Sequence, residues 1–215
     1  MSTEVKFTIS SHIKYHQETY KVLVPTLLKT GIPPEDIYFF IGGAEEYTQL
    51  EDSNGLRTYT VPHNSIDFTG LVSVVELDLI SDYWFLLHDT CYVGPSFYKT
   101  VVNTQYTADT IALTSYGHSM NMGAYSWKYL QRNKAKVLSY KNNNSADLQK
   151  FKHRLVHEED SLLTHEISFS KAEKEDLGVD TFYKGVPRRI THFPEIDLYK
   201  LQANWFTKEQ YTLDI

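Results

Sequence analysis

The first ninety residues alternate between short apolar runs and amphipathic stretches, and this order limits the possible folds more than any other feature of the chain. Short runs of β-branched and aromatic residues predict buried strands, and apolar side chains at helical spacing predict amphipathic helices. The resulting order is β-α-β-β-α-β. The expected strands cover residues 5–9, 37–41, 56–61 and 83–87, and the expected helices cover residues 16–30 and 68–80. Such alternation predicts an α/β fold with a mixed, mostly parallel sheet flanked by helices.

Local signals refine these elements and extend the pattern to the rest of the chain. Pro25 predicts a kink or an early end in the first helix, and Asp67 is a candidate N-cap for the second. Leu138 marks the start of a strand or a loop, and the sequence beyond Leu177 is less regular. We expect one domain over residues 1–215. Further helices are expected over residues 96–103, 122–133 and 146–157, with a strand over residues 110–114.

The composition is that of an ordinary globular protein, and it argues against several classes of function. The 215 residues carry a formal net charge of −6, whereas nucleic-acid binding needs a clustered basic surface. Cys91 is the only cysteine, so no internal disulfide can form, and this suits a reducing compartment. The chain shows no export signal and no apolar run near the ~20 residues that cross a bilayer. We therefore expect a cytoplasmic protein with no nucleic-acid partner and no membrane span.

Several nucleotide-binding and hydrolase motifs are absent from the sequence. The first expected strand is followed by SSHIKYH, residues 10–16, where a dinucleotide-binding protein needs a glycine-rich turn. The chain also lacks G-x-x-x-x-G-K-[ST] and G-x-S-x-G. These absences argue against a dinucleotide-dependent oxidoreductase, a P-loop NTPase, an α/β-hydrolase and a methyltransferase.

Polar side chains follow each of the expected parallel strands. The apolar run 83–87 stops abruptly at His88 and Asp89, and open α/β sheets bind their ligands at such strand ends. A turn that leads into a helix cap explains the same residues, so a site and a turn both remain open. We expect Cys91, two positions later, to be a small buried hydrophobe. The other strand ends offer short polar groups that suit a base and a ribose, each with a turn or cap as the alternative: Ser10, His12, Gly42, Asn64 and Asp67.

The segment HDTCYVGPSF, residues 88–97, resembles the strand-end motif of the nucleotide-sugar glycosyltransferases with the GT-A fold. Residues 5–43 are similar to the first β-α-β unit of that family, and the expected helix 68–80 is in the corresponding place. The likeness covers most of the chain, although its specific motif is short. It implies a UDP-sugar donor bound by residues 1–95 and a glycan or glycoprotein acceptor bound by residues 96–215.

Members of this family commonly carry Asp-x-Asp at this strand end, where two carboxylates bind Mn²⁺ or Mg²⁺ together with the diphosphate of the donor. This chain offers one carboxylate there, Asp89. The resemblance therefore implies a metal site at Asp89, with His88 as a second ligand or a ribose contact and His192 as a later ligand. Arg188 is a candidate for the phosphates because arginine binds them bidentately, although a solvated basic pair with Arg189 also explains it.

An acidic cluster over residues 158–160 follows the expected helix 146–157. In inverting members of the family, a carboxylate near this place takes the proton from the acceptor hydroxyl. The resemblance therefore implies Asp160 as the general base, with Glu159 as the second candidate. The same residues also suit a solvated acidic surface.

The leading hypothesis is an inverting, metal-assisted glycosyltransferase, and two alternatives remain. The missing second aspartate is compatible with a non-catalytic module that binds a sugar nucleotide or a glycan. A retaining glycosyltransferase would not use Asp160 as a simple base. The likeness extends to viral members of the family, which implies an acceptor among capsid glycans that are built in the host cytoplasm.

Overall fold

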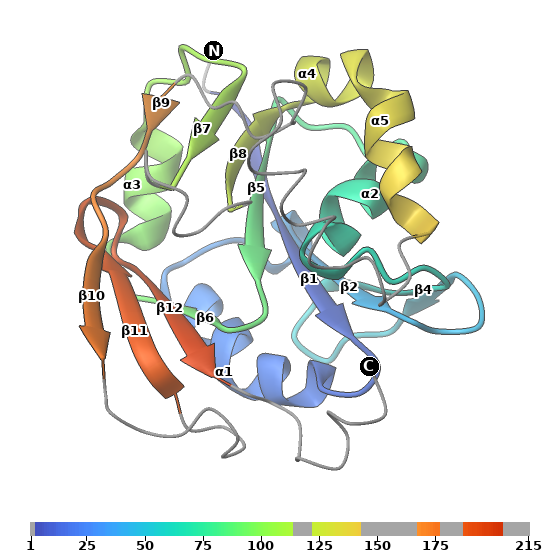
Figure 1. The fold of residues 1–215 in the computed structure, drawn as a ribbon, viewed down its shortest axis with the longest axis horizontal. Helices are drawn as coiled ribbons and strands as arrows, with labels where there is room; N and C mark the ends of the chain where they lie inside the picture. Colours follow the sequence, from blue (N-terminus) through green and yellow to red (C-terminus); the bar gives the residue numbers. More distant parts are fainter. Residues whose placement is uncertain (1–2, 114–121, 143–166, 177–186, 204–215) are drawn as a thin grey trace.

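The computed structural model describes residues 3–113, 122–142, 167–176 and 187–203, which form two β-sheets with helices packed around the larger one (Figure 1). The larger sheet has eight strands in the order β3-β4-β2-β1-β5-β8-β7-β9. Its centre, β4-β2-β1-β5, is parallel, so the predicted α/β class with a mixed, mostly parallel sheet is confirmed. The strands are β1 (Val5–His12), β2 (Ile37–Gly42), β3 (Thr48–Leu50), β4 (Arg57–Val61), β5 (Tyr83–His88), β7 (Thr110–Ala112), β8 (Gly123–Ser126) and β9 (Ile167–Ser168).

Strands β2 and β5 are largely apolar on both faces because helices cover both faces of the sheet. All six residues of β2 are buried. Adjacent residues of a strand point to opposite faces, and β5 shows the result. Phe85 and Leu87 pack in the core that includes α1 (His16–Lys29), whereas Trp84 and Leu86 pack in the core that includes α2 (Thr69–Glu76).

Helix α1 continues through Pro25 and ends at Lys29. The early end that Pro25 allowed therefore does not occur. The helix expected over residues 68–80 is shorter in the structure, where α2 ends at Glu76. No helix of the described ranges combines the length and the apolar character that a bilayer crossing needs. The other helices are α3 (Phe97–Asn103), α4 (Trp127–Arg132) and α5 (Lys134–Ser139), with 3-10 helices at Pro34–Asp36, Ile66–Phe68, Tyr140–Asn142 and Pro194–Ile196.

The prediction of one helix over residues 122–133 is wrong, because the first part of this segment is β8. This strand pairs antiparallel with both β5 and β7. Ser126 then caps α4 by accepting a hydrogen bond from the Tyr129 N–H at 3.1 Å. Tyr125 is fully buried between these strands and the helices, so it belongs to the core. Leu138 lies inside α5, where the sequence predicted a strand or loop.

A smaller antiparallel sheet with the order β10-β11-β12-β6 joins the middle of the chain to its C-terminal part. The strand β6 follows β5 after a turn at Asp89 and Thr90. The Leu201 N–H on β12 donates to the carbonyl oxygen of Thr90 at 2.7 Å, so this sheet lies against the end of β5 (Figure 1). Its strands are β6 (Cys91–Val93), β10 (Glu173–Asp176), β11 (Pro187–Phe193) and β12 (Leu198–Ala203).

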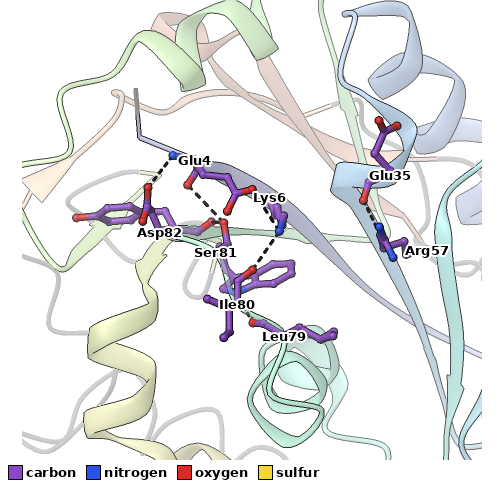
Figure 2. A network of polar contacts seen from close by, with 10 residues as sticks. Glu4, Lys6, Glu35, Arg57, Leu79, Ile80, Ser81 and Asp82 are labelled. Atoms are coloured by element: carbon purple, nitrogen blue, oxygen red, sulfur yellow. Dashed lines mark hydrogen bonds and ion pairs between the residues drawn. The ribbon is translucent and has the colours of Figure 1, made fainter. Parts of the chain in front are cut away.

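A polar network secures the amino ends of β1 and β5 (Figure 2). Lys6 Nζ donates to the carbonyl oxygen of Ile80 at 3.1 Å and pairs with the Glu4 carboxylate at 3.3 Å. The Glu4 N–H donates to Asp82 Oδ2 at 2.9 Å, and Ser81 Oγ donates to the Glu4 carbonyl oxygen at 3.4 Å. These contacts fix the amino ends of β1 and β5 relative to each other.

Candidate functional site

The carboxyl ends of β1, β2, β4 and β5 meet at one edge of the larger sheet. The parallel register places Ser10 beside His88 and His12 beside Gly42. The structure therefore brings four of the predicted site residues onto adjacent strand ends, where an open α/β sheet binds its ligand. A fifth, Asn64, lies exposed in the loop after β4.

Ser10 holds the segment that carries Asp67 against this edge. Its Oγ donates to the carbonyl oxygen of Asp67 at 2.9 Å and accepts from the Gly70 N–H at 2.9 Å. Only glycine allows this approach, because a Cβ on Gly70 would lie 2.4 Å from Thr8 Oγ1. The prediction of Asp67 as the N-cap is wrong, since it lies within a 3-10 helix and Phe68 occupies the cap position of α2.

Asp89 lies in the turn between β5 and β6, within electrostatic reach of two charged side chains. The pKa of its carboxyl is raised to about 7, first by loss of hydration and then by the negative charge of Asp67. The ammonium of Lys200 and the backbone N–H groups of Asp89 and Thr90 oppose that shift. The structure shows the turn that the sequence allowed, and a carboxyl perturbed in this way at a strand end marks a functional candidate, so the site stays a prediction.

Lys200 also belongs to this site, although no sequence pattern singled it out. It lies on β12, opposite Cys91 of β6. Its Nζ is 2.7 Å from His88 Nδ1, across 112 positions of sequence. The charges of Asp67 and Lys200, which come from two other segments, therefore both act on the Asp89 carboxyl at the end of β5.

His12 provides a flat aromatic surface at the same edge. Its ring stacks on Tyr15 with 5.5 Å between the ring centroids, and the Lys14 N–H donates to its Nδ1 at 3.2 Å. Gly43 lies directly against the ring, because a Cβ there would be 2.5 Å from His12 Nε2. Stacked aromatic rings of this kind suit contact with a planar base.

His63 is buried in a polar network and serves packing. Its Nδ1 lies 3.0 Å from Ser65 Oγ, and its Nε2 lies 3.3 Å from Ser73 Oγ and 3.8 Å from Glu76 Oε2. Burial, and then the positive charge of Lys141, lower the pKa of His63 to about 4. The imidazole is therefore neutral at physiological pH and links the loop after β4 to α2.

Cys91 is a packing residue, as expected from the sequence. The side chain is fully buried, and its Sγ lies 3.4 Å from Met122 Sδ. Burial raises the pKa of the Cys91 thiol to about 12, so the reactive thiolate is not formed at physiological pH.

The structure does not bring His192 to Asp89. The His192 ring stacks on Tyr199 with 4.2 Å between centroids, and its Nδ1 lies 3.7 Å from a Glu173 carboxylate oxygen. Tyr199 and Lys200 are neighbours on β12, so their side chains lie on opposite faces of the smaller sheet. His192 therefore faces away from the Lys200 ammonium.

The remaining predicted residues are only partly covered by the structure. Arg188 lies on β11, where its backbone position is described and its side chain is not. Asp160 and Glu159, together with the predicted helix 146–157, lie outside the described residues. Their roles, and the division at residue 95 into donor and acceptor halves, stay predictions.

Asp67 and Asp89 fit one kind of divalent cation site. Across the described ranges, no group of three or more His, Cys, Asp or Glu side chains is placed to hold a metal ion. Mg²⁺, however, is usually bound through one or two carboxylates that share it with substrate phosphates. A cation between the two aspartates would offset the repulsion that raises the pKa of Asp89.

No protein-family model matches this sequence, and no curated protein matches it. Its function is therefore inferred from the chemistry of the strand ends.

Proposed function

We propose that this chain is a glycosyltransferase that uses a nucleotide-sugar donor, with UDP-sugars as the expected class. The observation that carries this proposal is that Asp89, at the carboxyl end of β5, lies within electrostatic reach of both Asp67, whose segment Ser10 of β1 holds, and Lys200. Two carboxylates and an ammonium suit a diphosphate that is bridged by a divalent cation. A diphosphate is the part that most sugar nucleotides share. The resemblance of residues 88–97 to the GT-A motif supports the same assignment.

Each group at the strand ends has a role in this proposal. Asp67 and Asp89 would hold Mn²⁺ or Mg²⁺, and such a cation would supply positive charge to the diphosphate. Lys200 donates hydrogen bonds to phosphate oxygens. His12 stacks on the base, next to Tyr15.

The acceptor side of the proposed reaction involves residues outside the described ranges. Asp160, with Glu159 as the alternative, takes the proton from an acceptor hydroxyl while that oxygen attacks the anomeric carbon. Direct attack passes through an oxocarbenium-like transition state and inverts the anomeric centre. The proposed acceptor is a glycan or glycoprotein, and the proposed location is the cytoplasm, which for a viral protein is that of the host.

Donor binding and turnover test this proposal. Calorimetry with UDP and a panel of UDP-sugars should show binding that depends on Mn²⁺, and transfer should release UDP. Asp89→Asn should weaken this binding at least about tenfold, the effect of losing one charged contact. Asp82→Asn, an exposed carboxylate at the other end of β5, is the matched control and should bind like the wild type. Donor binding without UDP release on any acceptor would favour the non-catalytic module, and failure to bind any UDP-sugar would contradict the proposal.

The product distinguishes inversion from retention. NMR of the glycosidic product, made from a donor of known anomeric configuration, should show the opposite configuration. A retained configuration would exclude Asp160 as a simple base and would favour the retaining alternative.

A further inference from the structure

His88 and Lys200 are joined across the two sheets by a short polar contact. His88 is the last residue of β5 and is only 4% exposed, and Lys200 reaches it from β12 with 2.7 Å between Nζ and Nδ1. A lysine ammonium can donate hydrogen bonds but cannot accept them. Nδ1 of His88 is therefore the acceptor, and the proton of the neutral imidazole is on Nε2.

Neither ring nitrogen of His88 is presented to a ligand at the strand ends. Nδ1 is engaged by Lys200, and Nε2 is enclosed by protein atoms. A metal ion or a ribose could reach the ring only by displacing Lys200 or by opening the core. The ammonium of Lys200, in contrast, lies within electrostatic reach of Asp89, and the Lys200 residue is partly exposed.

We propose that His88 is a positioning residue that acts through Lys200, holding the ammonium at the anion-binding edge of the site, and that it is not a metal ligand. The proposal rests on the proposed function only in taking the bound anion to be a diphosphate.

The backbone on both sides of the contact is fixed, which makes the positioning effective. Lys200 is paired in register with Cys91, and the Leu201 N–H donates to the carbonyl oxygen of Thr90 at 2.7 Å. A free lysine side chain has many rotamers and loses that freedom when it binds an anion. Because His88 already holds Nζ, much of this loss has occurred before the anion arrives.

The tautomer of His88 tests the hydrogen-bond assignment without reference to function. In ¹⁵N NMR of histidine-labelled protein at one pH, His88 should show a protonated Nε2 and an unprotonated Nδ1. Lys200→Met should shift the Nδ1 resonance, because its donor is lost. A proton on Nδ1 in the wild type, or an Nδ1 resonance that Lys200→Met leaves unchanged, would overturn the proposal.

Two substitutions of His88 separate positioning from packing. Asparagine places its Oδ1 near the position of Nδ1, so His88→Asn keeps an acceptor for Lys200, whereas His88→Leu fills the space without one. Calorimetry with pyrophosphate as the probe should show affinity within about threefold of the wild type for His88→Asn and about tenfold weaker for His88→Leu. Lys200→Met should lose as much as His88→Leu, and combining the two should add little.

Each outcome of the affinity measurement bears on the proposal. Equal losses in His88→Asn and His88→Leu would mean that the imidazole serves in another way, and wild-type affinity in His88→Leu would mean that Lys200 needs no positioning. Pyrophosphate that fails to bind the wild type would contradict the proposed function instead, and the tautomer measurement would still decide the pairing of His88 with Lys200. Circular dichroism of every variant identifies any that do not fold.

Discussion

Loss of hydration, and after it the negative charge of Asp67, raise the pKa of Asp89 to about 7, although Asp67 and Asp89 come from separate segments of the chain. Ser10 places Asp67 by binding its carbonyl oxygen, and the turn after β5 places Asp89. Two carboxylates that repel each other are unfavourable in the absence of a cation. Such repulsion is expected where ligand binding, rather than the stability of the fold, determines which residues occupy these positions.

Asp89→Asn should stabilise the ligand-free protein at high pH. The carboxyl has a pKa of about 7 in the folded chain against 3.8 for the unperturbed group. Between these values the folded state holds a proton that the unfolded state has released, so the free energy of unfolding falls as pH rises through this window. An asparagine at position 89 has no carboxyl to titrate, so the variant loses this fall in the free energy of unfolding. Urea unfolding should show the variant more stable by on the order of 2 to 4 kcal/mol above about pH 8, and nearly equal to the wild type near pH 4.

Asp82→Asn is the control for that stability change, because Asp82 is exposed and an asparagine oxygen can still accept the hydrogen bond from the Glu4 N–H. A destabilised Asp89→Asn at high pH would mean that the carboxylate mainly serves to hold the turn through the N–H groups of Asp89 and Thr90.

Neutralising the two neighbours of Asp89 should move its pKa in opposite directions. Asp67→Asn removes a negative charge and should lower the pKa of Asp89, whereas Lys200→Met removes a positive charge and should raise it. Carboxyl ¹³C NMR titration of the two variants measures both shifts. Shifts of the same sign would mean that one of these side chains does not face Asp89.

Burial of His63 should weaken the protein in mild acid. The pKa of His63 is lowered to about 4 from an ordinary 6.5, so between these values the unfolded chain binds a proton that the folded chain does not. The contribution of His63 to the free energy of unfolding should therefore fall as pH falls through this window, with a slope of up to about 1.4 kcal/mol per pH unit that is opposite in sign to the slope from Asp89. Urea unfolding of His63→Gln should lose this slope, and the partly exposed control His16→Gln should keep it. An unchanged slope in His63→Gln would assign the acid sensitivity to another group.

The central parallel strands could be predicted from the sequence because their apolar runs are buried on both faces, whatever the rest of the chain does. The segment 122–133 could not, because its strand part depends on pairing with β5 and β7, and such pairing overrides local helical preference. The strands of the smaller sheet were missed for a related reason. Two of them, β6 and β10, are short, and the edge strand β6 comes from the middle of the chain and pairs with the distant β12.

The residues of the candidate site also divide into those with a local sequence signal and those that only the tertiary fold brings into place. Asp89 and His88 stand out in the sequence because His88 ends a buried strand and Asp89 directly follows it. The repulsion between Asp67 and Asp89 could not be predicted, since Asp67 lies in the 3-10 helix before α2 and Asp89 in the turn after β5, and only the tertiary fold brings their charges within reach of each other. Lys200 gives no local signal, because an alternating strand of mixed polarity, LYKLQA, fits many environments and its partner lies 112 positions away.

A comparison of two glycines should show how closely His12 is packed at the rim of the site. Gly43 and Gly31 both have left-handed backbone angles, with φ of +80° and +89°, but a Cβ on Gly43 would lie 2.5 Å from His12 Nε2, whereas one on Gly31 would meet nothing within 4 Å. Gly31→Ala should therefore lose only the conformational term, about 1 kcal/mol. Gly43→Ala should lose about 1 kcal/mol more, because the His12 ring must leave its stack on Tyr15. In a His12→Ala background the two glycine substitutions should have similar effects in urea unfolding. A difference that persists there would place the crowding at the backbone of Gly43 and not at the imidazole.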